Sequence, residues 1–231
     1  MTITLCLLTW NELEGCKHDV PLIDRRAFDD IFVIDAGSND GTIEYLQKQK
    51  IKVYKQDQKG INAAHIFAAK KCKTEAIIFY HPKGTIPVSD TLRFRKYFDQ
   101  GYELIIASRM IKGGKNEEDN KALKPRKWAV LLLAYITAVL WRREGHFVKD
   151  VLHGVRGVTK SAYRKINPRE TGLTIDIEGV IQSYKQKISR IEFPTKEASR
   201  NYGRSRFGFL KVGSEVIKLF VEELTRSESE Q

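Results

Sequence analysis

The sequence predicts an α/β protein built on a mostly parallel β-sheet with helices on its faces. Over the first hundred residues, short apolar runs of strand length alternate with amphipathic stretches, a spacing typical of βαβ units. The chain has 231 residues, of which 42% are hydrophobic and 30% charged, so it can bury a core and is too mixed in composition to be disordered. Ligands of such sheets bind at the carboxyl ends of the strands.

The individual elements follow from the periodicity of the apolar residues. Apolar runs predict strands at residues 3–8, 31–34, 52–54, 76–80 and 104–107. Recurrence every three or four positions predicts helices at residues 42–50, 63–71, 92–98, 128–141, 173–187 and 207–224, and a last strand is expected at 188–193. A polar loop covers 112–127, and 226–231 form a polar tail that we expect to fray.

Positive charge is concentrated in one part of the chain. The net charge is +11, and residues 109–211 alone hold 23 basic and 10 acidic side chains, for +13. Such a segment attracts nucleic acid, anionic membranes or phosphate-bearing small molecules. No RRM-type aromatic signature, helix-turn-helix pattern or zinc spacing accompanies it, so we expect no nucleic-acid partner.

Three features bear on the compartment. Cys6, Cys16 and Cys72 are too few and too scattered for a disulfide framework, which favours a reducing environment. The first strand has no secretory leader before it. The longest apolar run, from Trp128 to Trp141, is shorter than the about 20 residues that cross a bilayer. We therefore expect a cytoplasmic location and no membrane span.

Polar motifs follow two of the predicted strands. Thr9-Trp10-Asn11-Glu12 comes after the first, and the segment from Asp35 to Thr42 comes after the second. An aspartate at the end of a strand can accept hydrogen bonds from ribose hydroxyls or a base N–H, and Asp40 is a plausible N-cap for the next helix. Read without other information, the second motif could equally be an ordinary βα turn.

Taken together, these motifs resemble the nucleotide-sugar site of family 2 glycosyltransferases with the GT-A fold. Later segments resemble the polyprenyl-phosphate glycosyltransferases of the dolichyl-phosphate mannose synthase type. The similar segments are Ser108 to Gly114, the D-x-x-S-G-F-R-like stretch from Asp150 to Arg156 with His153 in place of serine, Glu192-Phe193-Pro194, and the run from Arg200 to Arg206. The resemblance covers nearly the whole chain in the family's order. It implies one GT-A domain over 1–225, with a nucleotide-sugar half (1–108) and an acceptor half (109–225) that carries membrane-interface helices.

The resemblance also implies roles for particular residues. Donor binding is expected at Thr9, Asn11, Glu12, Asp35, Gly37, Ser38, His81 and Lys83. The acceptor phosphate is expected at Arg126, Arg200, Ser205 and Arg206, and the residues expected to act in catalysis are Lys83, Arg109 and Arg200. The resemblance places Arg109 near the donor diphosphate, together with Lys83, and Arg200 at the acceptor phosphate. A guanidinium binds phosphate through two parallel hydrogen bonds, so replacing either arginine by lysine should reduce activity.

The chain departs from the family at the metal-binding motif. Where the family carries D-x-D, this sequence has His81-Pro82-Lys83. An imidazole and an ammonium are poor ligands for Mg²⁺ or Mn²⁺, which prefer oxygen. We therefore expect no cofactor, with Lys83 supplying the positive charge. Two alternatives are a binding relative that has lost its chemistry, and a divalent metal held instead by Glu117, Glu118 or Asp119.

The apolar run between Trp128 and Trp141 has basic residues beyond each end, Arg126 and Lys127 before it and Arg142 and Arg143 after it. This pattern suits a helix lying at a membrane surface, although a plain core helix would show the same run. We expect a peripheral protein on the cytosolic face of a membrane, with a membrane protein as a further candidate partner.

The implied reaction is the transfer of a sugar from a UDP- or GDP-sugar to undecaprenyl or dolichyl phosphate, with inversion. An isoprenoid phosphate is already ionised, so it needs no general base. The runner-up is elongation of a surface polysaccharide or glycolipid, whose acceptor hydroxyl would need one. Asp176 and Glu178, spaced i, i+2, do not share a helix face and are not expected to act together.

Overall fold

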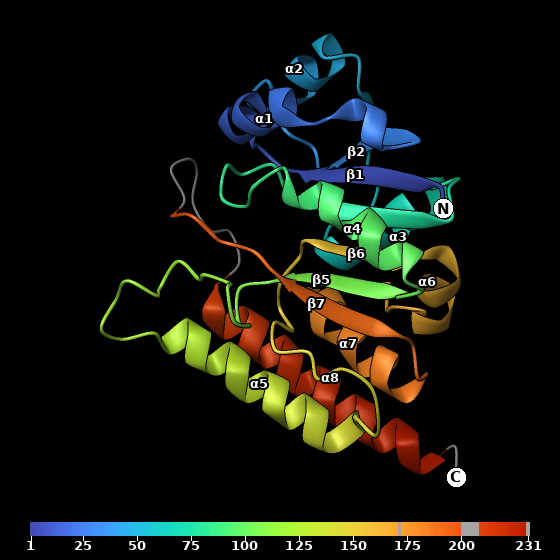
Figure 1. Ribbon diagram of the computed structural model, residues 1–231, viewed down its shortest axis with the longest axis vertical. Helices are drawn as coiled ribbons and strands as arrows, with labels where there is room; N and C mark the ends of the chain where they lie inside the picture. Colours follow the sequence, from blue (N-terminus) through green and yellow to red (C-terminus); the bar gives the residue numbers. More distant parts are fainter. Residues whose placement is uncertain (171, 200–207, 230–231) are drawn as a thin grey trace.

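The computed structural model describes residues 1–170, 172–199 and 208–229 (Figure 1). These residues form a seven-stranded sheet in the order β3-β2-β1-β4-β6-β5-β7. The strands are β1 (Ile3–Thr9), β2 (Asp30–Asp35), β3 (Lys52–Lys55), β4 (Ala76–Tyr80), β5 (Leu104–Ser108), β6 (Arg156–Thr159) and β7 (Arg190–Pro194). Within this sheet β6 runs antiparallel to β4 and β5, and the other neighbouring pairs are parallel. The predicted mostly parallel α/β sheet is confirmed.

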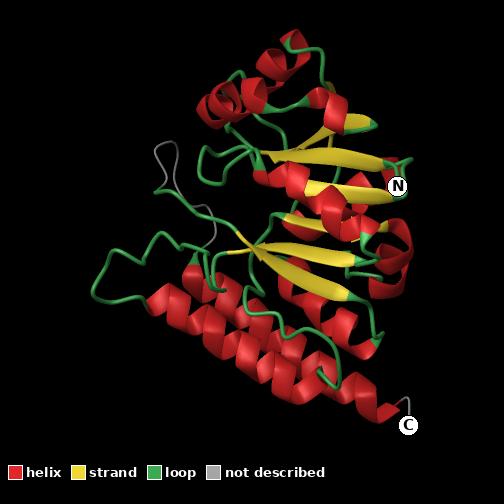
Figure 2. Cartoon of the chain, viewed as in Figure 1, coloured by secondary structure: helices red, strands yellow, loops and turns green. Residues whose placement is uncertain are grey.

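Helices cover both faces of the sheet (Figure 2). On one face lie α1 (Leu13–Asp19), α2 (Thr42–Lys48) and α4 (Asp90–Asp99). On the other lie α3 (Ile61–Lys71), α5 (Pro125–Trp141), α6 (Lys160–Ile166), α7 (Ile175–Lys185) and α8 (Phe209–Ser229). Two 3₁₀ turns, Val20–Leu22 and Arg25–Ala27, follow α1.

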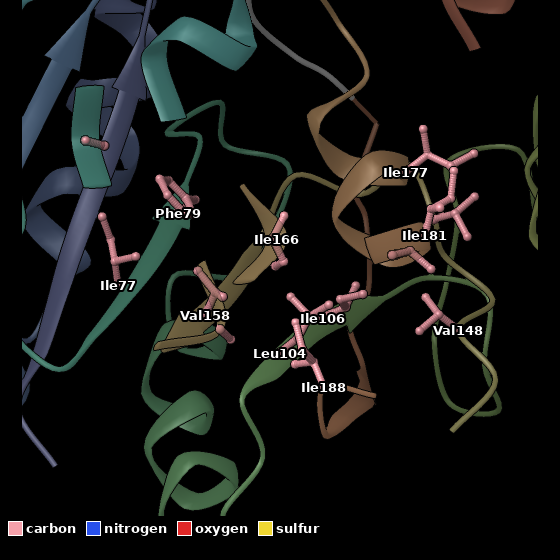
Figure 3. Close-up of a cluster of buried hydrophobic side chains, with 14 of the residues drawn as sticks. Ile77, Phe79, Leu104, Ile106, Val148, Val158, Ile166, Ile177, Ile181 and Ile188 are labelled. Atoms are coloured by element: carbon pink, nitrogen blue, oxygen red, sulfur yellow. The ribbon is translucent and has the colours of Figure 1, made fainter. Parts of the chain in front are cut away.

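Alternation along the strands explains this two-faced core. In β1, Leu5 and Leu7 point into the core under α1 and α4, whereas Cys6 and Leu8 point into the core under α3 and α7. All seven residues of β1 are buried, as expected for a strand covered on both sides. Figure 3 shows part of the second core, in which side chains of β4, β6 and β5 follow one another across the sheet and Ile177 and Ile181 of α7 lie on the β5 side.

Several boundaries differ from the sequence prediction. The predicted helix over 173–187 begins two residues later and ends two residues earlier. The helix α8 continues through Ser229, beyond the predicted helix end at 224, and 230–231 lie outside the described residues, so fraying of the polar tail stays a prediction. Asp40 is also one residue away from the cap position, which Gly41 occupies. Its carboxylate nevertheless accepts from the backbone N–H groups of Thr42 and Leu13, so it still satisfies the start of the helix.

The strand β6 and the helices α1 and α6 were not predicted. β6 is only four residues long and contains Gly157, a residue that weakens a strand signal. The rings of Phe94 and Phe98 occupy the space beside this glycine, since a Cβ there would lie 2.6 Å from Phe94 Cδ1 and 2.8 Å from Phe98 Cζ. Packing of α4 on the sheet therefore requires glycine at this position.

Candidate active site

A cavity of about 240 Å³ lies at the carboxyl ends of β1 to β4. Its apolar lining comes from Leu8, Ile34, Ala36 and the first turns of α3, and its polar lining from the loops that follow the strands. Thr9, Glu12, His81 and Lys83, four of the predicted donor-binding residues, line this cavity. This is the edge where ligands of parallel α/β sheets bind.

The other predicted donor residues hold the loops beside the cavity. The Asp35 carboxylate is buried and accepts four hydrogen bonds, from the Thr9 and Ser38 hydroxyls at 2.7 and 2.6 Å and from the Gly37 and Ser38 N–H groups at 2.8 and 2.7 Å. The Ser38 hydroxyl in turn accepts from the Asn11 N–H at 2.7 Å. The two motifs predicted to be neighbours therefore meet, and Asp35 fixes their relative position. A direct contact of Asp35 with the nucleotide stays a prediction.

Residues of α1 contact the backbone around the His81-Pro82-Lys83 segment. Asp19 accepts from the Gly84 N–H at 2.9 Å and from the Tyr80 hydroxyl at 3.0 Å. Gly15 allows close approach, because a Cβ there would lie 2.2 Å from the Pro82 carbonyl oxygen. The unpredicted helix α1 thus positions the segment at which the resemblance predicts the metal-binding motif.

His81 packs against Gly154, the residue after His153 in the D-x-x-H-G stretch. A Cβ at Gly154 would lie 2.7 Å from His81 Nε2. Burial, together with the neighbouring charge of Lys83, holds the pKa of His81 well below its usual range. Burial likewise lowers the pKa of His153 and of His65 to about 3. The three imidazoles are therefore neutral at physiological pH.

A network of charged side chains continues along the same edge, past β4. Arg109 donates to both oxygens of Asp150, at 2.9 and 2.8 Å, and contacts Glu197 at 3.1 Å. Burial alone would lower the pKa of Arg109, but Asp150 and Glu197 outweigh it and raise that pKa. The Arg109 side chain is 13% exposed and has two carboxylate partners, so its predicted contact with the donor diphosphate remains a prediction.

The predicted acceptor residues are only partly described. Arg126 lies in the first turn of α5, largely exposed, and pairs with Glu117 at 2.9 Å. Arg200, Ser205 and Arg206 lie outside the described residues.

The three loop carboxylates offered as alternative metal ligands have other partners. Glu117 pairs with Arg126, Glu118 accepts from the Lys127 N–H at 3.0 Å, and Asp119 pairs with Lys124 and Lys127. None of the three lines the cavity.

The residues at the end of β4 do not fit Mg²⁺ or Mn²⁺. His81 presses its ring on Gly154, and Lys83 brings a positive charge where the ion would carry its own. Among residues 1–170, 172–199 and 208–229, no group of three or more His, Cys, Asp and Glu side chains is arranged to hold a metal.

Comparison with known proteins agrees with this geometry. Residues 10–166 match the family model described as glycosyl transferase family 2, which is more than half of the chain. The chain belongs to glycosyl transferase family 2. It is a glycosyltransferase with the GT-A fold, as the sequence resemblance implied.

Individual relatives are distant but similar over most of their length. The UDP-N-acetylglucosamine–dolichyl-phosphate N-acetylglucosaminyltransferase of Methanococcus voltae is 23% identical, over 93% of each chain. Glycosyltransferase AglJ of Haloferax volcanii is 24% identical, over 83% of this chain and 62% of its own. Glucosyl-3-phosphoglycerate synthase of Mycobacterium tuberculosis, solved with Mn²⁺ and UDP-glucose, superposes with a TM-score of 0.66 at 16% identity, over 97% of this chain and 78% of its own. This last likeness shows the fold alone.

Sequence reasoning missed several residues of this family 2 site. Trp10, Gln56 and Lys59 line the cavity, and the last two follow β3 at the same sheet edge as the predicted residues. The polar residues after the predicted strand at 52–54 indicate Gln56 and Lys59 in the same way as those after the first two strands indicate the donor motifs. Arg156, which ends the D-x-x-S-G-F-R-like stretch, and Asp176 lie 3.0 Å apart, a contact that the sequence did not indicate because β6 was not predicted.

Proposed function

We propose that this chain transfers a sugar from a nucleotide diphosphate sugar to a polyprenyl phosphate, without a metal. Its main support is the position of Lys83, which lines the cavity at the end of β4 where the resembled family carries metal-binding carboxylates. The acceptor class is supported by the dolichyl-phosphate acceptor in the name of the Methanococcus voltae relative. That name and the UDP-glucose in the similar structure favour a uridine donor over a guanosine donor.

A comparison of formal charges supports the proposal that Lys83 takes the place of a divalent metal ion at the diphosphate. A D-x-D motif loaded with a divalent ion carries no net charge, because two carboxylates cancel the ion. His81-Pro82-Lys83 carries +1, because His81 is neutral and Lys83 is not. The segment therefore offers the diphosphate at least as much positive charge as the loaded motif.

The mechanism needs positioning and charge stabilisation more than proton transfer. The acceptor phosphate is already an anion, so it attacks the anomeric carbon in one displacement, the bond to the leaving diphosphate breaks, and the configuration inverts. Lys83 stabilises the negative charge that grows on the leaving diphosphate. Arg200, Ser205, Arg206 and Arg126 are proposed to draw in the acceptor phosphate, a role for which arginine is suited.

An exposed apolar surface supports a location at the cytosolic face of a membrane. Trp128, Leu132, Tyr135 and Val139 follow one another on α5 and are 53–63% exposed. Charged side chains are absent from 128–141, all of it described, and basic residues lie beyond both ends. Such a helix binds in the plane of an anionic interface.

The helix α8 adds to this apolar surface. It packs beside α5 through Trp141 and Phe220, whose ring centroids are 5.1 Å apart (Figure 1). Its own exposed side is apolar at Ile217, Val221 and Leu224. Each helix within the described ranges is too short or too polar to cross a bilayer.

Transfer of radiolabelled sugar to a short polyprenyl phosphate tests the proposal. Purified protein is incubated with UDP- and GDP-sugars, in excess chelator or in excess Mg²⁺. We expect a lipid-extractable product at similar rates in both conditions. Complete loss of turnover in chelator would refute metal independence, and transfer only to saccharide acceptors would refute the acceptor class.

A further inference from the structure

Asp176 is a carboxylate near the carboxyl ends of the strands, and the donor contacts proposed above give it no role. It lies in the first turn of α7, and its side chain is 19% exposed. Arg156 Nε lies 3.0 Å from Asp176 Oδ1, but that nitrogen donates instead to the His153 carbonyl oxygen. Among the described residues, Oδ1 is buried and accepts no hydrogen bond. Oδ1 faces Arg156 in an ion pair, so the 19% of the side chain that is exposed belongs to its other atoms, and a hydroxyl donor would reach the carboxylate from there.

Gly154 lies between Asp176 and His81, and His81 lines the cavity. A Cβ at Gly154 would lie 2.7 Å from His81 Nε2 and 3.8 Å from Asp176 Oδ2, so His81 and Asp176 flank the same glycine. Burial raises the pKa of Asp176, while the positive charges of Arg156 and Lys83 act in the opposite direction.

The sheet order indicates the direction in which a donor bound in the cavity would approach Asp176. The cavity runs from the loop after β3 to His81 and Lys83 after β4, and the next strand along the sheet is β6, which begins at Arg156. If the nucleoside lies in the cavity and the diphosphate against Lys83, as proposed above, a sugar beyond Lys83 on the side of β6 would lie toward Gly154 and Asp176. A sugar presents several hydroxyl donors, and a carboxylate accepts two at once.

We propose that Asp176 binds hydroxyl groups of the transferred sugar and takes part in selecting that sugar. This inference rests on the proposed donor site, because it takes the position of the diphosphate from Lys83. Arg156 positions the carboxylate through their ion pair. The neutral His81 fills the space that a side chain at position 154 would otherwise take.

The test compares a nucleotide with its sugar conjugate in the absence of acceptor. Isothermal titration of the full chain measures the dissociation constants of UDP and UDP-N-acetylglucosamine, with GDP and GDP-mannose as a second pair. For Asp176→Asn we expect UDP affinity within about twofold of the parent and sugar-conjugate affinity about tenfold to hundredfold weaker, as for a lost hydrogen bond to a charged group. An unchanged ratio of the two constants would overturn the inference, as would equal weakening of both.

Two further variants keep the outcome interpretable. Glu178→Gln removes a charge from the same turn of α7, but that side chain faces Arg169 and Asn62, so the ratio should not change. Asp176→Glu keeps a charge opposite Arg156 and, should the asparagine variant fail to fold, still moves the carboxylate enough to change the ratio.

The remaining outcomes separate this inference from the proposed function. If the parent chain binds neither nucleotide pair, the donor site itself is wrong. If Asp176→Asn binds UDP-N-acetylglucosamine normally but loses transfer to a hydroxyl acceptor, Asp176 is a general base and the sugar contact is refuted.

Discussion

Replacement of Lys83 by methionine removes the charge at the centre of the proposed donor site and keeps most of the side-chain volume. Two unit charges 4 Å apart at the dielectric typical of a protein surface interact by about 4 kcal/mol. Lys83 is half-buried, so solvent screens part of this energy, and hydrogen bonds to charged groups contribute about 1.5–3 kcal/mol in proteins. We therefore expect UDP to bind roughly 10- to 150-fold more weakly.

Titration calorimetry in excess chelator provides the measurement, with uridine, UMP and UDP as ligands. The loss should grow with the number of phosphates and be absent for uridine, because a lysine at the diphosphate has no contact with the base. Lys83→Arg keeps the charge and should retain most of the affinity. Equal UDP binding by Lys83→Met and the parent chain would refute the reasoning, since the positive charge would then have no part in donor binding.

Three further predictions concern packing, pH and the apolar surface. Gly154→Ala places a methyl group against His81, so calorimetric melting should show a loss of about 1–3 kcal/mol and UDP should bind more weakly; an unchanged melting curve would contradict the close packing. The pKa values of His65 and His153 fall from 6.5 in the unfolded chain to about 3 on folding, so the unfolded chain binds more protons between these limits. Urea unfolding should show full stability above pH 6.5 and a loss below it of up to about 1.4 kcal/mol per pH unit for each imidazole, and a flat profile from pH 7 to 5 would argue against burial of the neutral rings. Leu132→Glu should abolish sedimentation with anionic vesicles while leaving the melting temperature within about 2 °C, because the side chain is 60% exposed, and retained sedimentation would exclude this face of α5 from the contact.

The first half of the fold and its motifs could be predicted because the signals there are local. Each of the strands β1, β2 and β4 is an apolar run followed at once by polar residues, and parallel pairing brings those residues to one edge. Thr9 and Asp35 are 26 positions apart, yet their hydrogen bond follows from the register in which these two residues face each other.

The rest of the site depends on contacts that sequence periodicity does not contain. Asp176 and Arg156 meet because β6 enters the sheet in the opposite direction, and a four-residue strand containing glycine carries almost no pattern. Arg109 was expected at the diphosphate, but a lone arginine in a sequence does not indicate that Asp150 and Glu197 will surround it. The ion pairs of Arg109 form only when the segments that carry Arg109, Asp150 and Glu197 come together in the folded protein.

Because β6 lies between β4 and β5, the nucleotide-binding half of the chain cannot be separated from the rest without exposing strand edges. In the described chain β5 pairs with β6 and β7, both of which come later in the sequence, and β4 has β6 along its second edge. A fragment that stops at Ser108 would thus contain the nucleotide cavity but leave β5 without either neighbour and β4 with an open, wholly apolar edge. Such an edge invites aggregation, so attempts to express the nucleotide-binding part by itself should yield insoluble material.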